Sequence, residues 1–237
     1  MKSTMQKSPI TRLRGRLIYQ ILAGFLISLF SVFPALGQDK NPIPPQSRTL
    51  IPPEEQIQLA EGAASTEISQ QATIYVLKSK GYVKERTGTN GFTCLVEHQF
   101  LETFEPICYD AEGSATTMQA RLYREELRAT GLTEEEITKQ IDAGYKSGRF
   151  KAPGRPGFAY MLSTEARVFD HDSKKIITAP PHLMFYAPYL TSKDLGGRLG
   201  PNRPFLLWEG RPDTFIIIAP IFMCSGDAAK IWHCPGP

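Results

Sequence analysis

Two cysteines at matching positions in neighbouring β-rich runs constrain this chain more than any other feature. Cys94 and Cys108 are separated by a loop, residues 99–103, that is short enough for a hairpin. If Cys94 faces Cys108, then Val96 faces Pro106. Residues that face each other in an antiparallel pair lie about 4.5–5.5 Å apart at Cα, within reach of a disulfide. The sequence therefore predicts an antiparallel hairpin closed by Cys94–Cys108.

The N-terminus has the three parts of a secretory signal peptide. Basic residues without any acidic residue precede an apolar run at 17–33, and Ala35-Leu36-Gly37 places small residues where a signal peptidase cleaves. We expect cleavage before Gln38 and an exported protein that is periplasmic or secreted. The alternative is a retained helical anchor, because the run is barely long enough to span a bilayer.

Charge gives no reason to expect nucleic acid or an anionic membrane as a partner. The chain has 27 basic and 24 acidic residues. Five of the basic residues lie in the signal peptide, so the remainder has 22 against 24, a net charge of −2. No later stretch is long and apolar enough to span a membrane, so we expect no membrane contact after cleavage.

Four segments follow from these patterns and from proline content. Residues 1–37 form the signal peptide, 38–53 a proline-rich linker, 54–220 a single domain and 221–237 a C-terminal tail. The tail holds the other two cysteines.

An even number of cysteines in an exported chain favours disulfides. Among the three possible pairings we favour Cys94–Cys108 and Cys224–Cys234, because each pair is close in sequence. Zinc bound by the four sulfurs is the alternative. Neither pair has the short spacing of structural zinc sites, so we expect no metal and no cofactor.

The periodicity predicts an α+β domain, an antiparallel meander sheet with an α-helical hairpin packed on one face. Asn90-Gly91 tolerates the positive φ of tight turns and predicts a hairpin turn inside the meander. Apolar residues recur at helical spacing over 116–130 and 133–147. Thr133 and Glu136 predict a capping box at the second of these helices. The predicted meander strands are 72–77, 82–86, 92–98 and 105–110, and a further helix is expected over 54–64.

Several sequence blocks together resemble a group of uncharacterised bacterial secreted proteins. The blocks are Gly88-Thr89-Asn90-Gly91-Phe92-Thr93-Cys94-Leu95-Val96-Glu97, Pro106-Ile107-Cys108-Tyr109-Asp110-Ala111-Glu112-Gly113, Gly148-Arg149-Phe150, Ala159-Tyr160-Met161-Leu162-Ser163 and Pro181-His182-Leu183-Met184-Phe185-Tyr186-Ala187-Pro188. The resemblance covers roughly residues 54 to 220 and implies one coherent exported domain. It implies no activity and no functional residue, and it does not extend to Cys224 and Cys234.

His182 is the strongest candidate for chemistry at neutral pH, because histidine titrates there. A hydrolase could use His182 with Asp110 or Glu112, which follow the strand of Cys108. The competing interpretation is a histidine at the end of a loop that bonds only to backbone. Glu97 and His98 are a weaker pair, since adjacent strand residues point to opposite faces.

Three further groups of polar residues have weaker functional interpretations. Asp110, Glu112 and Ser114 could hold calcium, although helix capping explains them as well. The loop arginines Arg198, Arg203 and Arg211 could recognise an anion, although scattered surface arginines are common. Asp170-His171-Asp172 could likewise bind a metal, although a solvated turn is far commoner.

No catalytic or cofactor motif is present. We therefore expect non-catalytic binding of a small ligand or a partner protein, based on the aromatic stretch 183–189. A hydrolase is the first alternative, and a structural envelope protein is the second.

Overall fold

The computed structural model describes residues 50–98, 103–170, 174–196 and 205–218. All of these residues lie in the second of two compact units, Met1–Pro42 and Ile43–Pro237. The predicted signal peptide and the predicted pair Cys224–Cys234 lie outside the described residues. Within the described ranges, no helix is both long enough and apolar enough to cross a membrane.

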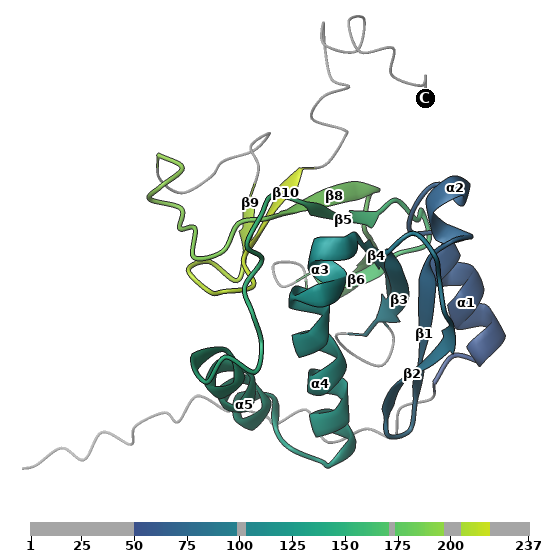
Figure 1. The fold of residues 1–237 in the computed structure, drawn as a ribbon, viewed down its shortest axis with the longest axis horizontal. Helices are drawn as coiled ribbons and strands as arrows, with labels where there is room; N and C mark the ends of the chain where they lie inside the picture. Colours follow the sequence, from purple (N-terminus) through teal and green to yellow (C-terminus); the bar gives the residue numbers. More distant parts are fainter. Residues whose placement is uncertain (1–49, 99–102, 171–173, 197–204, 219–237) are drawn as a thin grey trace, which may run out of the picture. The chain divides into compact units, whose positions relative to one another are not determined.

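An eight-stranded mixed sheet with helices on its faces forms the centre of the second unit (Figure 1). The strand order is β2-β1-β3-β4-β5-β8-β10-β9, and β6 and β7 form a separate two-stranded ribbon. The strands are β1 (Thr73–Lys78), β2 (Gly81–Arg86), β3 (Thr93–Glu97), β4 (Glu105–Tyr109), β5 (Phe158–Met161), β6 (Arg167–Asp170), β7 (Lys175–Thr178), β8 (His182–Tyr186), β9 (Phe205–Leu207) and β10 (Phe215–Ile218). The helices are α1 (Pro53–Glu61), α2 (Thr66–Ser69), α3 (Ala111–Ala115), α4 (Thr117–Ala129) and α5 (Glu134–Lys146). The predicted α+β class is confirmed.

The hairpin of β3 and β4 has the predicted register. Cys94 faces Cys108 with Cα atoms 4.0 Å apart, the two sulfurs form a disulfide, and Val96 faces Pro106. Both cysteines are fully buried. The disulfide therefore joins the two strands inside the core, as the sequence predicts.

The order of the first three strands differs from the predicted meander. β1 lies between β2 and β3, and it pairs with β3 in parallel. Asn90 consequently does not close a β2–β3 hairpin: its side-chain amide donates to the carbonyl of Ile68 at 2.8 Å. Gly88 lies against the backbone that precedes β1, where an added Cβ would be 2.3 Å from the carbonyl carbon of Ala72. The glycine thus allows the chain to cross from β2 to β3 past the start of β1.

Helix α1 covers one face of the sheet. The sequence predicted helices packed on one face only, so this second helical layer was not expected. Pro53 begins the helix at a position where a missing amide proton costs nothing, and acidic residues follow in its first turn. Leu59 and Ala60 pack in one core with Val76 and Cys94. The disulfide therefore lies in the core on the α1 side.

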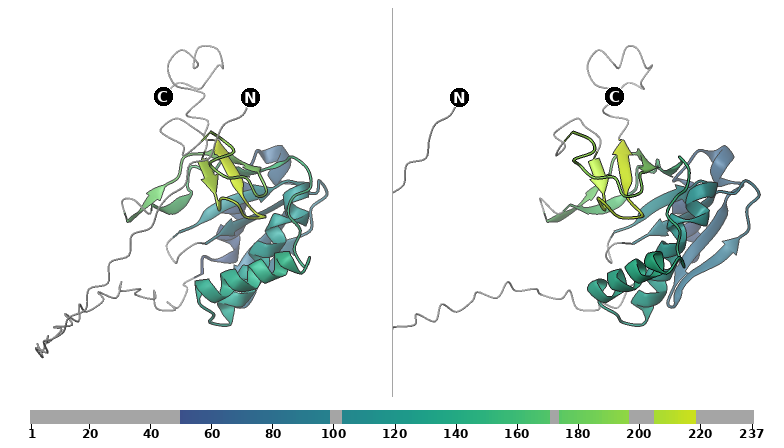
Figure 2. Two further views of the ribbon diagram at one scale, coloured as in Figure 1. Left: turned by 90° about the vertical axis from the view of Figure 1, so that its left-hand side faces the viewer. Right: turned by 60° about the vertical axis from the view of Figure 1, so that its left-hand side comes forward.

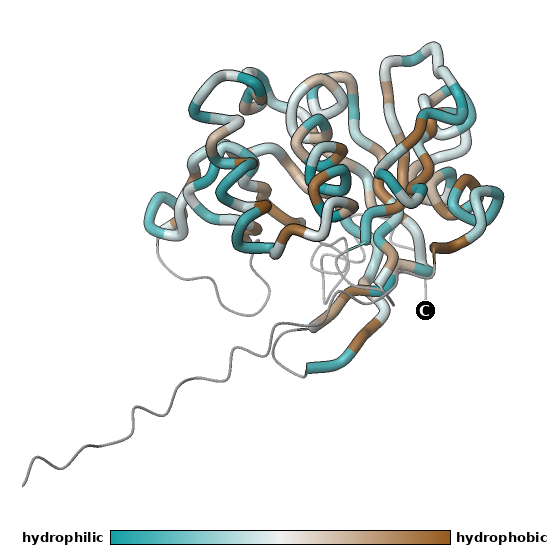
Figure 3. The backbone as a smooth tube through the Cα atoms, turned by 90° about the horizontal axis from the view of Figure 1, so that it is seen from below, coloured by the Kyte–Doolittle hydropathy of each residue, from teal (hydrophilic) through white to brown (hydrophobic). Residues whose placement is uncertain are grey.

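Helices α4 and α5 form the predicted helical hairpin on the other side (Figure 2). Met118 of α4 packs in a second core with Leu95 and Ile107 of the central hairpin, while Leu127 and Ile141 join the two helices. Hydrophobic and hydrophilic residues alternate along the helices, as expected when one face of each is buried (Figure 3).

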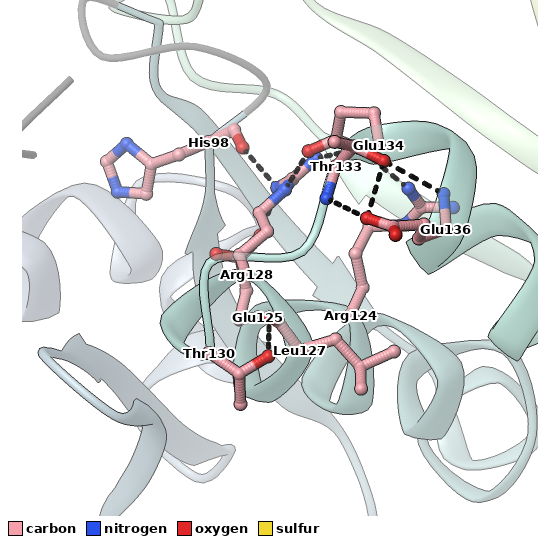
Figure 4. Close-up of polar contacts among 9 residues, drawn as sticks. All are labelled: His98, Arg124, Glu125, Leu127, Arg128, Thr130, Thr133, Glu134 and Glu136. Atoms are coloured by element: carbon pink, nitrogen blue, oxygen red, sulfur yellow. Dashed lines mark hydrogen bonds and ion pairs between the residues drawn. The ribbon is translucent and has the colours of Figure 1, made fainter. Parts of the chain in front are cut away.

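The connection between α4 and α5 is held by a polar network in which each charge is paired (Figure 4). Arg128 bonds to Glu125, to both carboxylate oxygens of Glu134 and to the carbonyl of His98 at 3.0 Å. Thr133 begins α5 with the predicted capping box. This network ties the end of β3 to the helical hairpin and has a structural role.

Candidate functional site

A second polar cluster lies between α4, α5 and the turn that joins β9 to β10. It comprises Arg121, Asp142, Tyr145, Arg211 and Asp213, and we call it the Arg121 cluster. The Asp213 side chain is 2% exposed and the Arg121 side chain 8% exposed, and Nη2 of Arg121 lies 3.4 Å from Oδ2 of Asp213. Arg211 pairs with Oδ1 of Asp213 at 3.0 Å and with Asp142 of α5 at 2.8 Å. One buried carboxylate is therefore shared by two guanidinium groups.

Buried polar atoms in this cluster lack hydrogen-bond partners among the described residues. These atoms are Nε and Nη2 of Arg121, the hydroxyl of Tyr145 and Nη2 of Arg211. The ion pair between Arg121 and Asp213 thus contributes charge but no well-aligned hydrogen bond. A buried polar group without a partner costs about 1–3 kcal/mol. The cluster differs in this respect from the Arg128 network, where each charge is paired, and buried polar groups of this kind call for an explanation in the fold or in the function.

Two exposed aromatic residues border the Arg121 cluster, and we call them the aromatic rim. The ring of Trp208 lies over the guanidinium of Arg121 at 3.8 Å, and it meets the ring of Phe215 at an interplanar angle of 62° with ring centroids 5.9 Å apart. Tyr189 lies near enough to raise the pKa of Tyr145 electrostatically, although burial of Tyr145 contributes more to that rise. Trp208 is 41% exposed and Tyr189 is 60% exposed. Large aromatic surface is thus held at the solvent boundary beside buried charges.

Both rim residues have a backbone conformation that side chains disfavour. Their φ angles are +53° at Trp208 and +64° at Tyr189, in the left-handed region. This region costs an ordinary L-residue roughly 1–2 kcal/mol. Strained positions of this kind cluster at binding and catalytic sites, where the surrounding structure enforces them.

Hydrogen bonds between two loops enforce this strain. The amide of Tyr189 donates to the carbonyl of Arg211 at 2.8 Å, and the amide of Gly210 donates to Leu190 at 2.9 Å. The hydroxyl of Thr214 bonds to the carbonyl of Trp208 at 2.6 Å. The segments that carry the two rim residues are therefore fastened to each other.

Charges keep Arg121 ionised despite its burial. Burial alone would lower its pKa, but Asp213 and Glu97 raise the pKa above the ordinary value of arginine. For Tyr145, burial is the main cause of a raised pKa and Asp213 adds to it, so the phenol keeps its proton. The site thus offers guanidinium and phenol donors at any physiological pH.

A pair of carboxyl groups faces Arg121 from the sheet. Glu97 and Glu105 are directly opposed on β3 and β4, and the hydroxyl of Tyr109 donates to Glu97. Burial and the charge of Glu97 raise the pKa of Glu105 to about 8. Glu105 therefore favours its protonated form at neutral pH.

The structure does not bring His182 together with the predicted carboxylates. His182 pairs with Met161 of β5, whereas Asp110 lies at the level of Phe158. His182 and Asp110 are thus separated by three residues along the strand direction and by two strand spacings across the sheet. This puts their Cα atoms roughly 14 Å apart. The His182 ring bonds to the carbonyl of Pro180 at 2.8 Å, and burial lowers its pKa.

Asp110 and Glu112 have structural partners. Asp110 caps α3 through the amide of Gly113 at 2.8 Å and accepts the hydroxyl of Tyr186 at 3.0 Å. Glu112 accepts from the amide of Gly154 at 2.7 Å and from Arg155 at 2.8 Å. These bonds, with that from the Gly154 amide as the largest cause, lower the pKa of Glu112 and keep it ionised.

The remaining candidates from the sequence fall in different places. Ser114 donates to the carbonyl of Tyr109 at 3.3 Å, and among the described residues no three histidine, cysteine or acidic side chains are grouped so that they could hold a metal. Glu97 and His98 bond to different partners, Tyr109 and Thr103. Arg211 belongs to the Arg121 cluster. Arg198, Arg203 and the pair His171-Asp172 lie outside the described residues.

The aromatic stretch is mostly part of the core. Met184 and Tyr186 are buried, and Tyr189, which lies after β8, is the exposed aromatic of this stretch. Elsewhere, a hollow of about 360 Å³ lies beside the β6–β7 ribbon, and its lining consists of Arg167, Ile176, Ile177 and Thr178. The described residues of its lining include no aromatic side chain and no ion pair, so the aromatic rim is the better candidate.

Sequence reasoning missed Arg121, Tyr145, Trp208 and Asp213. Arg121 interrupts the apolar face of α4, since it lies between Met118 and Leu122. A charged residue on a buried helix face was the one available signal. Tyr145, Trp208 and Asp213 are distant from Arg121 in the sequence and come close to it only in the folded protein.

Comparisons with known protein families, with curated proteins and with solved structures find no match to this chain. The geometry of the site is therefore the basis on which a function can be proposed.

Proposed function

We propose that this protein is a non-catalytic binding protein and that its ligand binds at the aromatic rim above the Arg121 cluster. The observation that carries the proposal is the strained, exposed conformation of Trp208 and Tyr189. The strained backbone costs stability at each residue, and much of each side chain remains in solvent, so a binding role explains the conformation better than packing alone does. Tryptophan, tyrosine and arginine are also the residues that contribute most to binding energy in known interfaces.

The two alternatives have less support. A hydrolase built on His182 lacks the carboxylate contact that orients a catalytic base, because Asp110 and Glu112 bond elsewhere. A purely structural envelope protein would have no need for exposed aromatic side chains at strained backbone positions.

We propose that the protein is exported, to the periplasm or beyond the cell. The disulfide Cys94–Cys108 supports this, because it is compatible with an oxidising compartment. The basic and apolar N-terminal sequence supports it independently.

Native mass spectrometry of the protein purified from its producing cells tests the binding role. We expect a small-molecule adduct on the natural protein that is absent from the double variant Trp208→Ala/Tyr189→Ala. The variant Ile177→Ala is the matched control, since Ile177 is 42% exposed but lies on the β6–β7 ribbon. An adduct that survives equally in the double variant would place the ligand elsewhere and contradict the proposal.

A further inference from the structure

We infer that the C-terminal segment, residues 219–237, packs back against the β6–β7 ribbon and covers the hollow beside it. The inference is independent of the ligand site proposed at the aromatic rim. Three observations carry it. The ribbon has apolar residues that the described part of the chain leaves partly exposed, the segment begins close to the root of the ribbon, and the segment is rich in apolar residues.

Apolar side chains lie on both faces of the ribbon without being fully buried. Val168 faces Ile177 and Phe169 faces Ile176 in the antiparallel pairing. Since neighbouring residues of a strand point to opposite faces, each face carries one of these pairs. All four residues are at least partly exposed, and Ile177 is 42% exposed. A two-stranded ribbon is only marginally stable by itself, so packing against a further segment would stabilise this one.

The hollow of about 360 Å³ gives such a segment a place to pack. Its described lining combines the apolar side chains of Ile176 and Ile177 with Arg167 and Thr178. Volumes of roughly 300–1,000 Å³ are typical of sites that enclose a small ligand, so the hollow has room for apolar side chains of a bound segment. A segment that enters the hollow would remove Ile176 and Ile177 from water.

The C-terminal segment begins close to the root of the ribbon. At this root, the amide of Ala179 donates to the carbonyl of Ala166 at 2.9 Å. Ala179 lies four residues before Leu183, and Leu183 pairs with Ile218 at the end of β10. A chain spans at most about 3.6 Å per residue and paired strands lie about 5 Å apart, so Ile218 lies within roughly 20 Å of Ala179. Residues 219–237 can extend roughly 60 Å and can therefore reach every part of the ribbon.

The composition of the segment suits an apolar surface. It contains Ile221-Phe222-Met223 and Ile231-Trp232, and its charged residues are Asp227 and Lys230. Because the segment belongs to the same chain, its effective concentration at the ribbon is roughly millimolar, as for other short tethers. A second copy of the protein at about micromolar concentration competes poorly with a tethered segment. The C-terminal segment is therefore the favoured occupant of the hollow.

Limited digestion of the full chain with trypsin tests the inference, because Lys230 is a cleavage site within the segment. Mass spectrometry after reduction measures the rate at which residues 231–237 are lost, and a synthetic peptide of residues 219–237 gives the rate for a free segment. The variants Ile177→Asp and Thr178→Asp place a charge in the hollow. Val83→Asp is the control for the first, since Val83 is 43% exposed on β2. Lys175→Asp is the control for the second, since Lys175 is an exposed ribbon residue outside the described lining.

We expect cleavage after Lys230 to be at least about tenfold slower in the natural protein than in the peptide, because trypsin cleaves the segment only when it is not packed. Ile177→Asp and Thr178→Asp should be cleaved at nearly the rate of the peptide. Both controls should be cleaved within about twofold of the natural rate. Thr178→Asp leaves the apolar pairs of the ribbon intact, so its effect would come from the hollow and not from loss of the ribbon.

Three other outcomes would overturn the inference. Equal rates for the natural protein and the peptide would show that the segment does not pack on the ribbon. Slow cleavage that neither Ile177→Asp nor Thr178→Asp accelerates would place the segment elsewhere on the protein. Sedimentation equilibrium tests the remaining occupant: a dimer that Ile177→Asp dissociates, with cleavage after Lys230 unchanged, would assign the hollow to a second copy. The proposed ligand site is unaffected by any of these results, because every variant keeps Trp208 and Tyr189.

Discussion

Replacing Asp213 with asparagine should destabilise the protein strongly, because it leaves two guanidinium groups without their shared counter-charge. The asparagine side chain has the same size and keeps one acceptor oxygen, so packing changes little. Arg121 would then remain buried, with 8% of its side chain exposed and no paired charge from the β9–β10 turn. Two unit charges 3.4 Å apart interact by about 5 kcal/mol at an effective dielectric constant of 20. Breaking buried pairs costs about 3–5 kcal/mol in practice, and we expect a loss in this range.

Asp142→Asn is the matched control, since it removes a carboxylate from the same Arg211. The Asp142 side chain is 41% exposed, and solvent screens such pairs to roughly 0–1 kcal/mol. Urea unfolding at pH 7, followed by circular dichroism, gives the free energy of unfolding of both variants. The reasoning is refuted if Asp213→Asn costs less than about 1 kcal/mol, or no more than Asp142→Asn.

Three further results follow from the structure. The double substitution of Cys94 and Cys108 by alanine should lower the free energy of unfolding by about 3 kcal/mol, because it opens a loop closed over a separation of 14 residues; equal urea midpoints with and without reductant would contradict this. Glu105 has a folded pKa of about 8, above its unfolded value. Its contribution to the free energy of unfolding is therefore fully present below about pH 4.5 and is lost as the pH rises toward 8. Glu105→Gln should therefore gain stability relative to the natural protein at pH 8 but not at pH 5, and a difference independent of pH would oppose the assignment. Tyr189→Asn should be neutral or stabilising by up to about 1 kcal/mol, since asparagine tolerates the left-handed region; a clear loss of stability would show that Tyr189 serves the fold.

The local features of the fold could be predicted from sequence, because they depend on neighbouring residues. The register of Cys94 with Cys108 follows from a short loop and the period of a strand. The capping box of Thr133 and Glu136 depends on residues three positions apart. Such features can be predicted because they do not depend on contacts between distant segments.

The strand order could not be predicted, because it depends on contacts between distant segments. Asn90-Gly91 is typical of a hairpin turn, yet here Asn90 bonds to Ile68 of α2 and the chain crosses to the far side of β1. The parallel pairing of β1 with β3 is set by where α1 and α2 place the start of β1. Turn chemistry alone does not contain this information.

The candidate site was predicted only through Arg211 and Tyr189. Arg211 was one of three loop arginines considered for anion recognition, and the structure places it in ion pairs within the Arg121 cluster. Asp213 and Trp208 cannot be recognised as site residues from the sequence, because they contact Arg121 of α4 only in the folded protein. His182 was the strongest sequence candidate because histidine titrates near neutral pH, but its ring bonds to a backbone carbonyl in the structure.

Hydroxyl-radical footprinting of the protein in its producing cells, compared with the purified protein after removal of bound small molecules, tests the central claim most directly. If the aromatic rim binds a ligand, oxidation of Trp208 and Tyr189 should be several-fold lower in the cells. Val83 and Ile177, which are 43% and 42% exposed, should be modified equally in both samples. Equal modification of Trp208 and Tyr189 in the two samples would contradict the account.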